Sequence, residues 1–346
     1  IEDVAAYALA HWDEQKALAV RADAELSRSR LSAAQKFQLA HAVRSYYGAT
    51  EFLVTGDGEP FWTVNEGEYR MLNTFDLTVD HLFFELDRNP WVVRNQLDWF
   101  VKRYSYRDKV RLPGDSTEYP GGLSFTHDMG IGNCISRPGY SSYEKFGLDG
   151  CFSHMTHEQL VNWVCCATSY VLQTNDTQWL KKNLGVFRSC LKSLVNRDHP
   201  DPKKRDGVMS ADSSRCLGGA EITTYDSLDV SLGQARNNLY LAVKTWSAYL
   251  GLSEMLSGRP ARLASEQAVL CARTICANMR SDGFIPAVMG EGNESRIIPA
   301  IEGLAFPLYW GMKKLLARGG GFAFLKEALA RHLGTVLVPG VCKFRD

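Results

Sequence analysis

The sequence predicts a mostly helical domain with long loops at one end, and its apolar pattern is the main reason. Apolar residues recur at helical spacing in several segments between residues 156 and 315. Short breaks separate the members of each pair of segments, and longer loops connect one pair to the next. This rhythm is typical of stacked helical hairpins, in which functional loops gather at one end.

The first 50 residues predict helices. Residues 1–30 are rich in Ala and charged residues and contain neither Gly nor Pro, so we expect a helical linker there, ahead of a main domain at 31–346. At the start of the main domain, Ser32 and Gln35 form a capping-box pattern before an apolar helical stripe, and Gly48 is a natural end for that helix.

The next part predicts a β-hairpin, a helix and then loops. Residues 51–64 carry two apolar runs around a Gly-Asp-Gly turn. Asn89 and Pro90 suit the N-cap and first position of a helix. Residues 105–155 are rich in Gly, Ser, Pro, Asp and Tyr and lack clear periodicity, so we expect functional loops.

The C-terminal half predicts helical hairpins. One expected helix begins at Thr156. The others cover residues 177–196, 239–250, 264–279 and 301–315. Residues 203–230 predict a second long loop between two of them.

Composition excludes several classes of protein. The 346 residues suffice for one large domain with a sizeable core. Since 39 basic residues balance 39 acidic ones, neither nucleic acid nor an anionic membrane is expected as a partner. No apolar run reaches the roughly 18 residues of a transmembrane helix. The 9 Cys show no CxxC spacing and predict buried thiols in a reducing compartment, so we expect a cytoplasmic protein.

Two acidic stretches, far apart in the sequence, contain the candidate catalytic residues. One is NEGEYR at residues 65–70, continuing through NTFDL at 73–77, and the other is EITTYDSLD at 221–229. A single Asp or Glu in a loop most often caps a helix or faces water. Two such clusters, each beside aromatic and hydroxyl side chains, instead indicate paired carboxylates for acid–base work.

These strings give the chain a strong resemblance to glycoside hydrolase family 52, the β-xylosidases. The resemblance covers the chain from about residue 31 to its end. It rests on VNEGEYRM (64–71), NTFDLTVD (73–80), TEYPGG (117–122), FTHDMG (125–130), GCFSHMTHEQL (150–160), GGAE (218–221), GQARNN (233–238) and IPAVMGEGN (285–293).

The resemblance implies a fold and a domain organisation. The fold is an (α/α)6 barrel of six helical hairpins, incomplete here, with a small β-hairpin and long loops at the active-site end. It also implies an N-terminal β-sandwich domain before this segment and further barrel helices after it. Because the chain starts and stops abruptly at Ile1 and Asp346, we expect a fragment.

The resemblance also implies the catalytic residues. Retaining hydrolysis needs a nucleophilic carboxylate and a second carboxyl group that acts as acid and then as base. The family's Glu nucleophile falls on Glu66 and its Asp acid/base on Asp226. Glu68 is the alternative nucleophile, and Asp229 or Glu221 the alternative acid. The candidate ligands of the sugar, implied by this family and its wider clan, are Asp76, His127, Asp128, Thr224 and Tyr225.

A metal site is a weaker interpretation of one motif. His154, His157 and Glu158 form HxxHE, which differs from the HExxH of zinc hydrolases and has no apparent third ligand nearby. We therefore predict helix capping and hydrogen bonding for these side chains, and neither a metal nor a cofactor.

The expected function is that of a retaining exo-β-xylosidase, which releases xylose from the non-reducing end of xylo-oligosaccharides such as xylobiose. A β-glucosidase-type hydrolase of the same clan is one alternative. A non-catalytic carbohydrate-binding α/α module is another. The substrate is the expected partner, and the full-length protein is a candidate homodimer.

Overall fold

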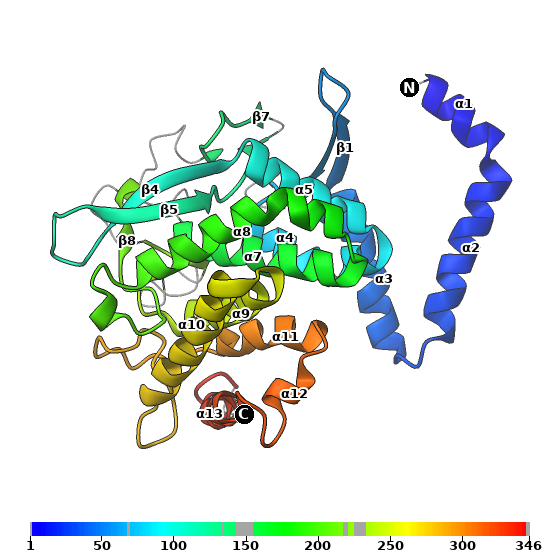
Figure 1. The fold of residues 1–346 in the computed structure, drawn as a ribbon. Helices are drawn as coiled ribbons and strands as arrows, with labels where there is room; N and C mark the ends of the chain where they lie inside the picture. Colours follow the sequence, from blue (N-terminus) through cyan, green and yellow to red (C-terminus); the bar gives the residue numbers. More distant parts are fainter. Residues whose placement is uncertain are drawn as a thin grey trace. The chain divides into compact units, whose positions relative to one another are not determined.

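The computed structural model describes residues 2–67, 70–132, 134–142, 155–216, 221–224 and 233–343 (Figure 1). The chain divides into two compact units, Ile1–Glu51 and Phe52–Asp346. The first unit holds α1 (Glu2–Ala10), α2 (Trp12–Arg28) and α3 (Ala33–Gly48). The predicted capping box is confirmed, because Ser32 accepts from the Gln35 N–H while the Gln35 side chain accepts from the Ser32 N–H.

The second unit is mostly helical, as predicted. Three helical hairpins have connections of only one or two residues between their helices. They are α4 (Phe75–Arg88) with α5 (Pro90–Lys102), α7 (Thr156–Thr174) with α8 (Thr177–Asp198), and α9 (Leu239–Met255) with α10 (Gly258–Ala277). Shorter helical pieces follow, namely η6 (Pro299–Leu304), α11 (Ala305–Tyr309), α12 (Lys313–Leu316) and α13 (Ala323–Val336), and the 3-10 turns η2 (Pro202–Lys204) and η3 (Ser214–Cys216) precede α9.

Three small sheets accompany the helices. The predicted hairpin is β1 (Thr50–Val54) with β2 (Pro60–Val64). A second sheet has the order β3 (Met71–Leu72), β6 (Gly130–Ile131), β7 (Cys134–Ile135), and a third has the order β5 (Tyr119–Phe125), β4 (Ser105–Arg111), β8 (Asp212–Ser213). All described pairings within the second and third sheets are antiparallel.

Two predictions about secondary structure were wrong. Residues 105–125 are not simply loops, because β4 and β5 form a ladder that packs on α8. The strand β5 approaches α8 closely at Gly122, where a Cβ would come within 2.2 Å of the Ser193 Oγ. The single helix expected over 301–315 is interrupted near Gly311, whose φ of 79° ends α11 before α12 begins.

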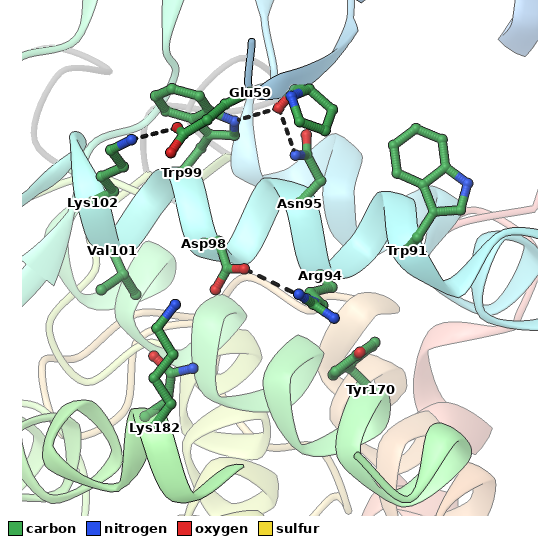
Figure 2. A pocket seen from close by; sticks show the side chains of 12 residues that line it. Glu59, Trp91, Arg94, Asn95, Asp98, Trp99, Val101, Lys102, Tyr170 and Lys182 are labelled. Atoms are coloured by element: carbon green, nitrogen blue, oxygen red, sulfur yellow. Dashed lines mark hydrogen bonds and ion pairs between the residues drawn. The ribbon is translucent and has the colours of Figure 1, made fainter. Parts of the chain in front are cut away.

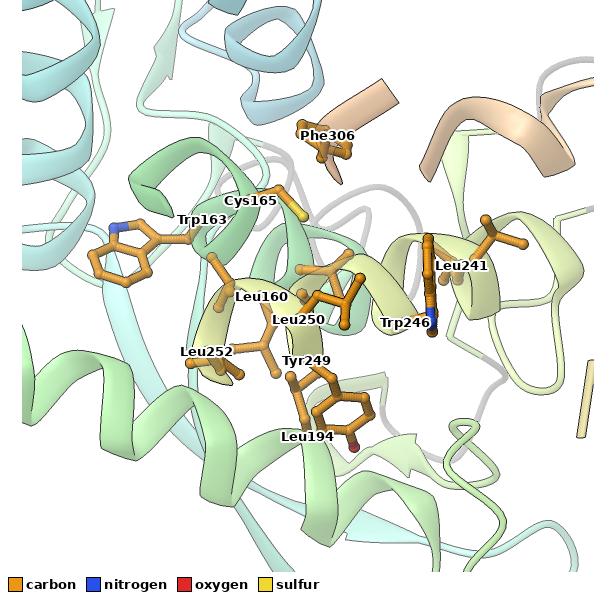
Figure 3. Close-up of a cluster of buried hydrophobic side chains, with 14 of the residues drawn as sticks. Leu160, Trp163, Cys165, Leu194, Leu241, Trp246, Tyr249, Leu250, Leu252 and Phe306 are labelled. Carbon is orange, nitrogen blue, oxygen red and sulfur yellow. The ribbon is translucent and has the colours of Figure 1, made fainter. Parts of the chain in front are cut away.

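The core of this unit is built on α7 and α9, which are buried on almost every side. A helix surrounded by other elements needs no polar face, so apolar residues occur on more than one side of these two helices. Trp163 of α7 stacks on Phe125 with ring centroids 5.4 Å apart and meets Phe187 of α8 at 5.0 Å. Figure 3 shows part of the buried cluster, including Leu160 and Trp163 of α7 and Tyr249 of α9. The helices α7 and α9 also pack against each other, and the polar residues described below lie in their first halves.

The cysteines and the helix lengths can be described for most of the chain. The described cysteines are free thiols, and most of them are buried. Within the described ranges, no helix is both long and apolar enough to cross a membrane.

Candidate active site

Glu66 stands at the tip of a tight hairpin that continues β2. Asn65 pairs with Leu72, and the Glu66 N–H donates to the Met71 carbonyl at 2.8 Å. In return, the Arg70 N–H donates to the Glu66 carbonyl at 2.7 Å, with Arg70 at a φ of 55°. The turn therefore fixes the backbone of Glu66 on both sides. Its placement just past the second strand is as predicted, while the alternative nucleophile Glu68 lies outside the described residues.

Asn73 locks this hairpin onto α5. It is fully buried, adopts a φ of 50°, and accepts from the Val64 N–H at 2.7 Å and from the Gln96 side chain at 3.1 Å. Its amide also donates to the Trp62 carbonyl at 2.9 Å. Asn tolerates the left-handed region better than most residues, so the sequence suits this position.

Strand pairing and a backbone hydrogen bond bring His127 and Asp128 close to Glu66. Strand β3 pairs with β6, and the Phe75 N–H donates to the His127 carbonyl at 2.9 Å. Burial first, and then the nearby carboxylate of Asp76, raise the pKa of Glu66, while His127 works in the opposite direction. The predicted residues Glu66, Asp76, His127 and Asp128 are therefore electrostatic neighbours.

His127 carries a positive charge at neutral pH. Its Nδ1 lies 3.0 Å from an Asp128 carboxylate oxygen, and both side chains are almost completely buried. Burial opposes the imidazolium, but the Asp128 hydrogen bond and the charge of Asp76 outweigh it and raise the pKa of His127 to about 9. Asp128 in turn accepts from the N–H groups of Gly130 and Ser142, at 3.0 and 2.9 Å.

Asp76 offers an unused acceptor at this site. It lies in the first turn of α4, and its Oδ1 is buried with no hydrogen-bond partner in the part of the chain that the structure describes. A buried carboxylate oxygen without a donor is costly in a folded protein, and functional sites are one place where such groups persist. A sugar hydroxyl is a suitable donor for it.

The second acidic stretch is described only at its beginning, residues 221–224. The Thr223 N–H donates to the Gly233 carbonyl, and the Ala235 N–H to the Glu221 carbonyl, both at 2.8 Å. Residues 221–223 and 233–235 therefore form one short antiparallel stem. Tyr225, Asp226 and Asp229 lie outside the described residues, so their predicted roles remain predictions.

Glu221, the other alternative acid, is engaged in local structure. It is fully buried and accepts from the N–H groups of His157, at the start of α7, and Ser213, at the end of β8. Burial raises its pKa to about 8, although Arg197 opposes the shift. These contacts hold together the stem, α7 and β8.

Glu158, for which we predicted helix capping and hydrogen bonding, contacts the second acidic stretch. It accepts from the N–H of Thr224 at 2.9 Å and from its hydroxyl at 2.7 Å. Asp76 is among the charges that raise the pKa of Glu158, after burial, which is the largest cause. Asp76 thus interacts with Glu66 on one side and with Glu158 on the other, which links the two acidic stretches. The only signal in the sequence was an acid at the start of an otherwise uncharged helix.

A metal site at the HxxHE motif gains no support from the described residues. His157 is buried, and its Nε2 lies 2.8 Å from the Thr245 hydroxyl. Burial, followed by the charge of Arg197, lowers its pKa to about 3. No cluster of three potential metal ligands occurs among the residues that the structure describes, and His154 lies outside them.

A cavity of about 670 Å³ lies elsewhere, over α5 (Figure 2). None of the predicted site residues lines it. Several of its groups already have partners within the protein. Asn95 and the Trp99 indole both donate to the Pro60 carbonyl, and the Lys102 ammonium lies 4.9 Å from the Trp99 ring centroid. We assign no sugar to this cavity.

Comparison with known proteins identifies the family. Residues 1–170 match glycosyl hydrolase family 52. A β-xylosidase of Geobacillus stearothermophilus is 57% identical over 350 residues, which cover 100% of this chain and 50% of that protein. The chain belongs to glycosyl hydrolase family 52. A second relative, also named β-xylosidase and from the same organism, is 53% identical over 288 residues, 82% of this chain and 46% of the relative. The chain spans about half the length of these curated relatives.

Proposed function

We propose that the whole protein is a retaining exo-β-xylosidase acting on xylo-oligosaccharides such as xylobiose. The observation that carries the proposal is the placement of Glu66. A hydrogen-bonded turn holds its backbone, and Asp76, His127 and Asp128 surround it. Family membership and the names of the two relatives point to the same substrate class.

In the proposed mechanism, the two carboxyl groups exchange roles between two steps. The Glu66 carboxylate attacks the anomeric carbon while Asp226 gives its proton to the departing glycosidic oxygen. A water molecule then attacks the xylosyl ester and gives a proton to Asp226. The bond to Glu66 breaks, and xylose leaves with its β configuration retained.

The described side chains support the first step. Glu66 must be anionic to attack, and the His127 imidazolium beside it favours that charge state against burial and Asp76. The half-buried Asp76 is proposed to accept a hydrogen bond from a xylose hydroxyl through its unpartnered oxygen. His127 is proposed to donate one. Hydrogen bonds that strengthen in the transition state contribute directly to turnover.

Product stereochemistry tests the mechanism. The first-formed xylose from a β-xyloside, followed by proton NMR before mutarotation, should be the β anomer. An α-xylose product would overturn the retaining assignment. Glu66→Ala should abolish turnover, and azide should restore activity while forming the α-xylosyl azide. In Asp226→Ala, azide should give the β-xylosyl azide instead, because the nucleophile remains.

The same assays decide between substrate classes. A matched pair of nitrophenyl xyloside and glucoside separates a xylosidase from a glucosidase. A non-catalytic module would bind sugar and release no nitrophenol from either compound. We also propose a cytoplasmic location, which the buried free thiols favour.

A further inference from the structure

A buried chain of hydrogen bonds runs from η6 through α9 and α7 to Thr224. Lys244 contacts Glu302 at 3.1 Å and donates to the Tyr240 hydroxyl at 2.8 Å. The Tyr240 hydroxyl lies 2.9 Å from Glu158, whose carboxylate takes both bonds from Thr224. Glu158, Tyr240 and Lys244 are all buried.

The donors in this chain of hydrogen bonds favour a negative charge on Glu158. A lysine ammonium has no acceptor, so the Tyr240 oxygen must accept from Lys244 and turn its own proton toward Glu158. With the N–H and hydroxyl of Thr224, three donors then point at one carboxylate. Three donors favour the ionised form of a carboxyl group. Burial raises the pKa of Glu158, and the neighbouring Lys244 acts against that rise.

The arrangement is more than a helix cap. Glu158 lies in the first turn of α7, where an acid often serves its own helix N-terminus. Within the described part of the chain, its side-chain hydrogen bonds go instead to Thr224 and to Tyr240 of α9. The third element, η6, reaches α9 because Gly303 has no side chain. A Cβ there would come within 2.5 Å of the Val243 backbone, beside Lys244.

We propose that Glu158 is a positioning residue for the acid/base step, acting through Thr224. The proposal rests on the proposed function, because Asp226 follows Thr224 by two residues in the sequence. By taking both donors of Thr224, Glu158 fixes the backbone and the rotamer at the point where the segment with the acid/base begins. In this proposal the main role of the Thr224 hydroxyl is its hydrogen bond to Glu158, and a contact with the sugar is secondary.

The test compares two substrates that differ in their need for acid catalysis. Xylobiose has a poor leaving group and needs a well-placed acid, whereas a dinitrophenyl xyloside does not. Glu158→Gln places an amide N–H against the donors of Thr224 and should lower kcat/KM for xylobiose about 100-fold. For the dinitrophenyl compound the loss should stay within roughly threefold. Thr224→Val, which keeps the shape and removes the hydroxyl, should show the same selectivity with a smaller loss.

Two controls make the outcome decisive. Glu85→Gln changes another fully buried glutamate, in α4 and outside this chain of bonds, and should affect both substrates equally. Asp226→Ala should itself lower kcat/KM for xylobiose much more than for the dinitrophenyl xyloside. If it does not, the assignment of Asp226 as the acid fails, and this result says nothing against Glu158. When Asp226→Ala is selective, an equal loss on both substrates in Glu158→Gln and Thr224→Val would overturn the positioning role. If Glu158→Gln does not fold by circular dichroism, Thr224→Val decides alone.

Discussion

The Nδ1 of His127 and a carboxylate oxygen of Asp128 lie 3.0 Å apart, in a nearly inaccessible pair beside Glu66. Two N–H groups, from Gly130 and Ser142, donate to the other carboxylate oxygen. Asp128 therefore has a structural role toward its loop and an electrostatic role toward His127. The two roles can be separated by substitution.

The charge of His127 should appear in the pH dependence of turnover. Its pKa of about 9 keeps the imidazolium present at neutral pH, so kcat/KM should fall as the pH rises through about 9. Asp128→Asn removes the negative charge, and the alkaline limb should move to lower pH by roughly 1–2 units. Because the folded pKa lies above the unfolded value of 6.5, the pair stabilises the fold fully below pH 6.5 and loses this effect as the pH approaches 9. An imidazole resonance titrating near 6.5 would contradict this.

His127→Ala and Asp128→Ala should differ in stability although both lower turnover. Removing Asp128 leaves the buried N–H groups of Gly130 and Ser142 without their acceptor, at a cost of about 1–3 kcal/mol for each. His127→Ala removes the proposed sugar donor and a cation, and it leaves those N–H groups bonded. Urea unfolding of the two variants should therefore show the lower midpoint for Asp128→Ala. Equal midpoints would mean that the loop does not depend on Asp128.

Asn73 should be essential for holding Glu66. Asn73→Ala removes three buried hydrogen bonds and places Ala at a φ of 50°, so the free energy of unfolding should fall by about 2–4 kcal/mol. Asn73→Gly loses the same bonds without the backbone strain and should be roughly 1 kcal/mol more stable than the Ala variant. Chemical denaturation gives both values. Turnover should fall in both variants, because Val64 and Trp62 of β2 lose their hydrogen bonds to the Asn73 side chain.

The sequence predicted those elements in which one periodicity dominates. The helices α7, α8, α9 and α10 were predicted because their apolar residues recur at helical spacing. The strands β4 and β5 were missed because their sequences lack clear periodicity. Contacts with other elements stabilise them instead. Asp108 of β4, for example, is a buried acid whose burial depends on Arg197 of α8.

For the candidate site, local pattern predicted the position of Glu66 just past β2, but it did not predict the contacts of Glu158. A strand followed by Gly-containing turn chemistry marks the position of Glu66 in one stretch of sequence. Glu158 gains its meaning from contacts with Thr224 and Tyr240, which only the packing of α7 against α9 creates. Such a contact leaves no trace in the spacing of residues along the chain.

The buried ion pair between Arg197 and Asp108 should respond unequally to removal of its two partners. The Arg197 Nη2 donates to an Asp108 carboxylate oxygen at 2.7 Å, and both side chains are inaccessible. Asp108→Ala leaves a buried guanidinium with its nearest counter-charge removed and should cost about 3–5 kcal/mol. In Arg197→Met, Asp108 still accepts from the Gly122 N–H and the Ser213 hydroxyl, so the loss should be smaller.

A half-exposed pair supplies the control for this comparison. Arg94 and Asp98, drawn in Figure 2, approach to 3.7 Å on the surface of α5. Arg94→Met should change the free energy of unfolding by less than about 1 kcal/mol, because water screens such a pair. The expected order of destabilisation in urea is therefore Asp108→Ala, Arg197→Met, Arg94→Met. If Arg197→Met were as damaging as Asp108→Ala, packing of the arginine side chain between α8 and β4 would outweigh the unpaired charge.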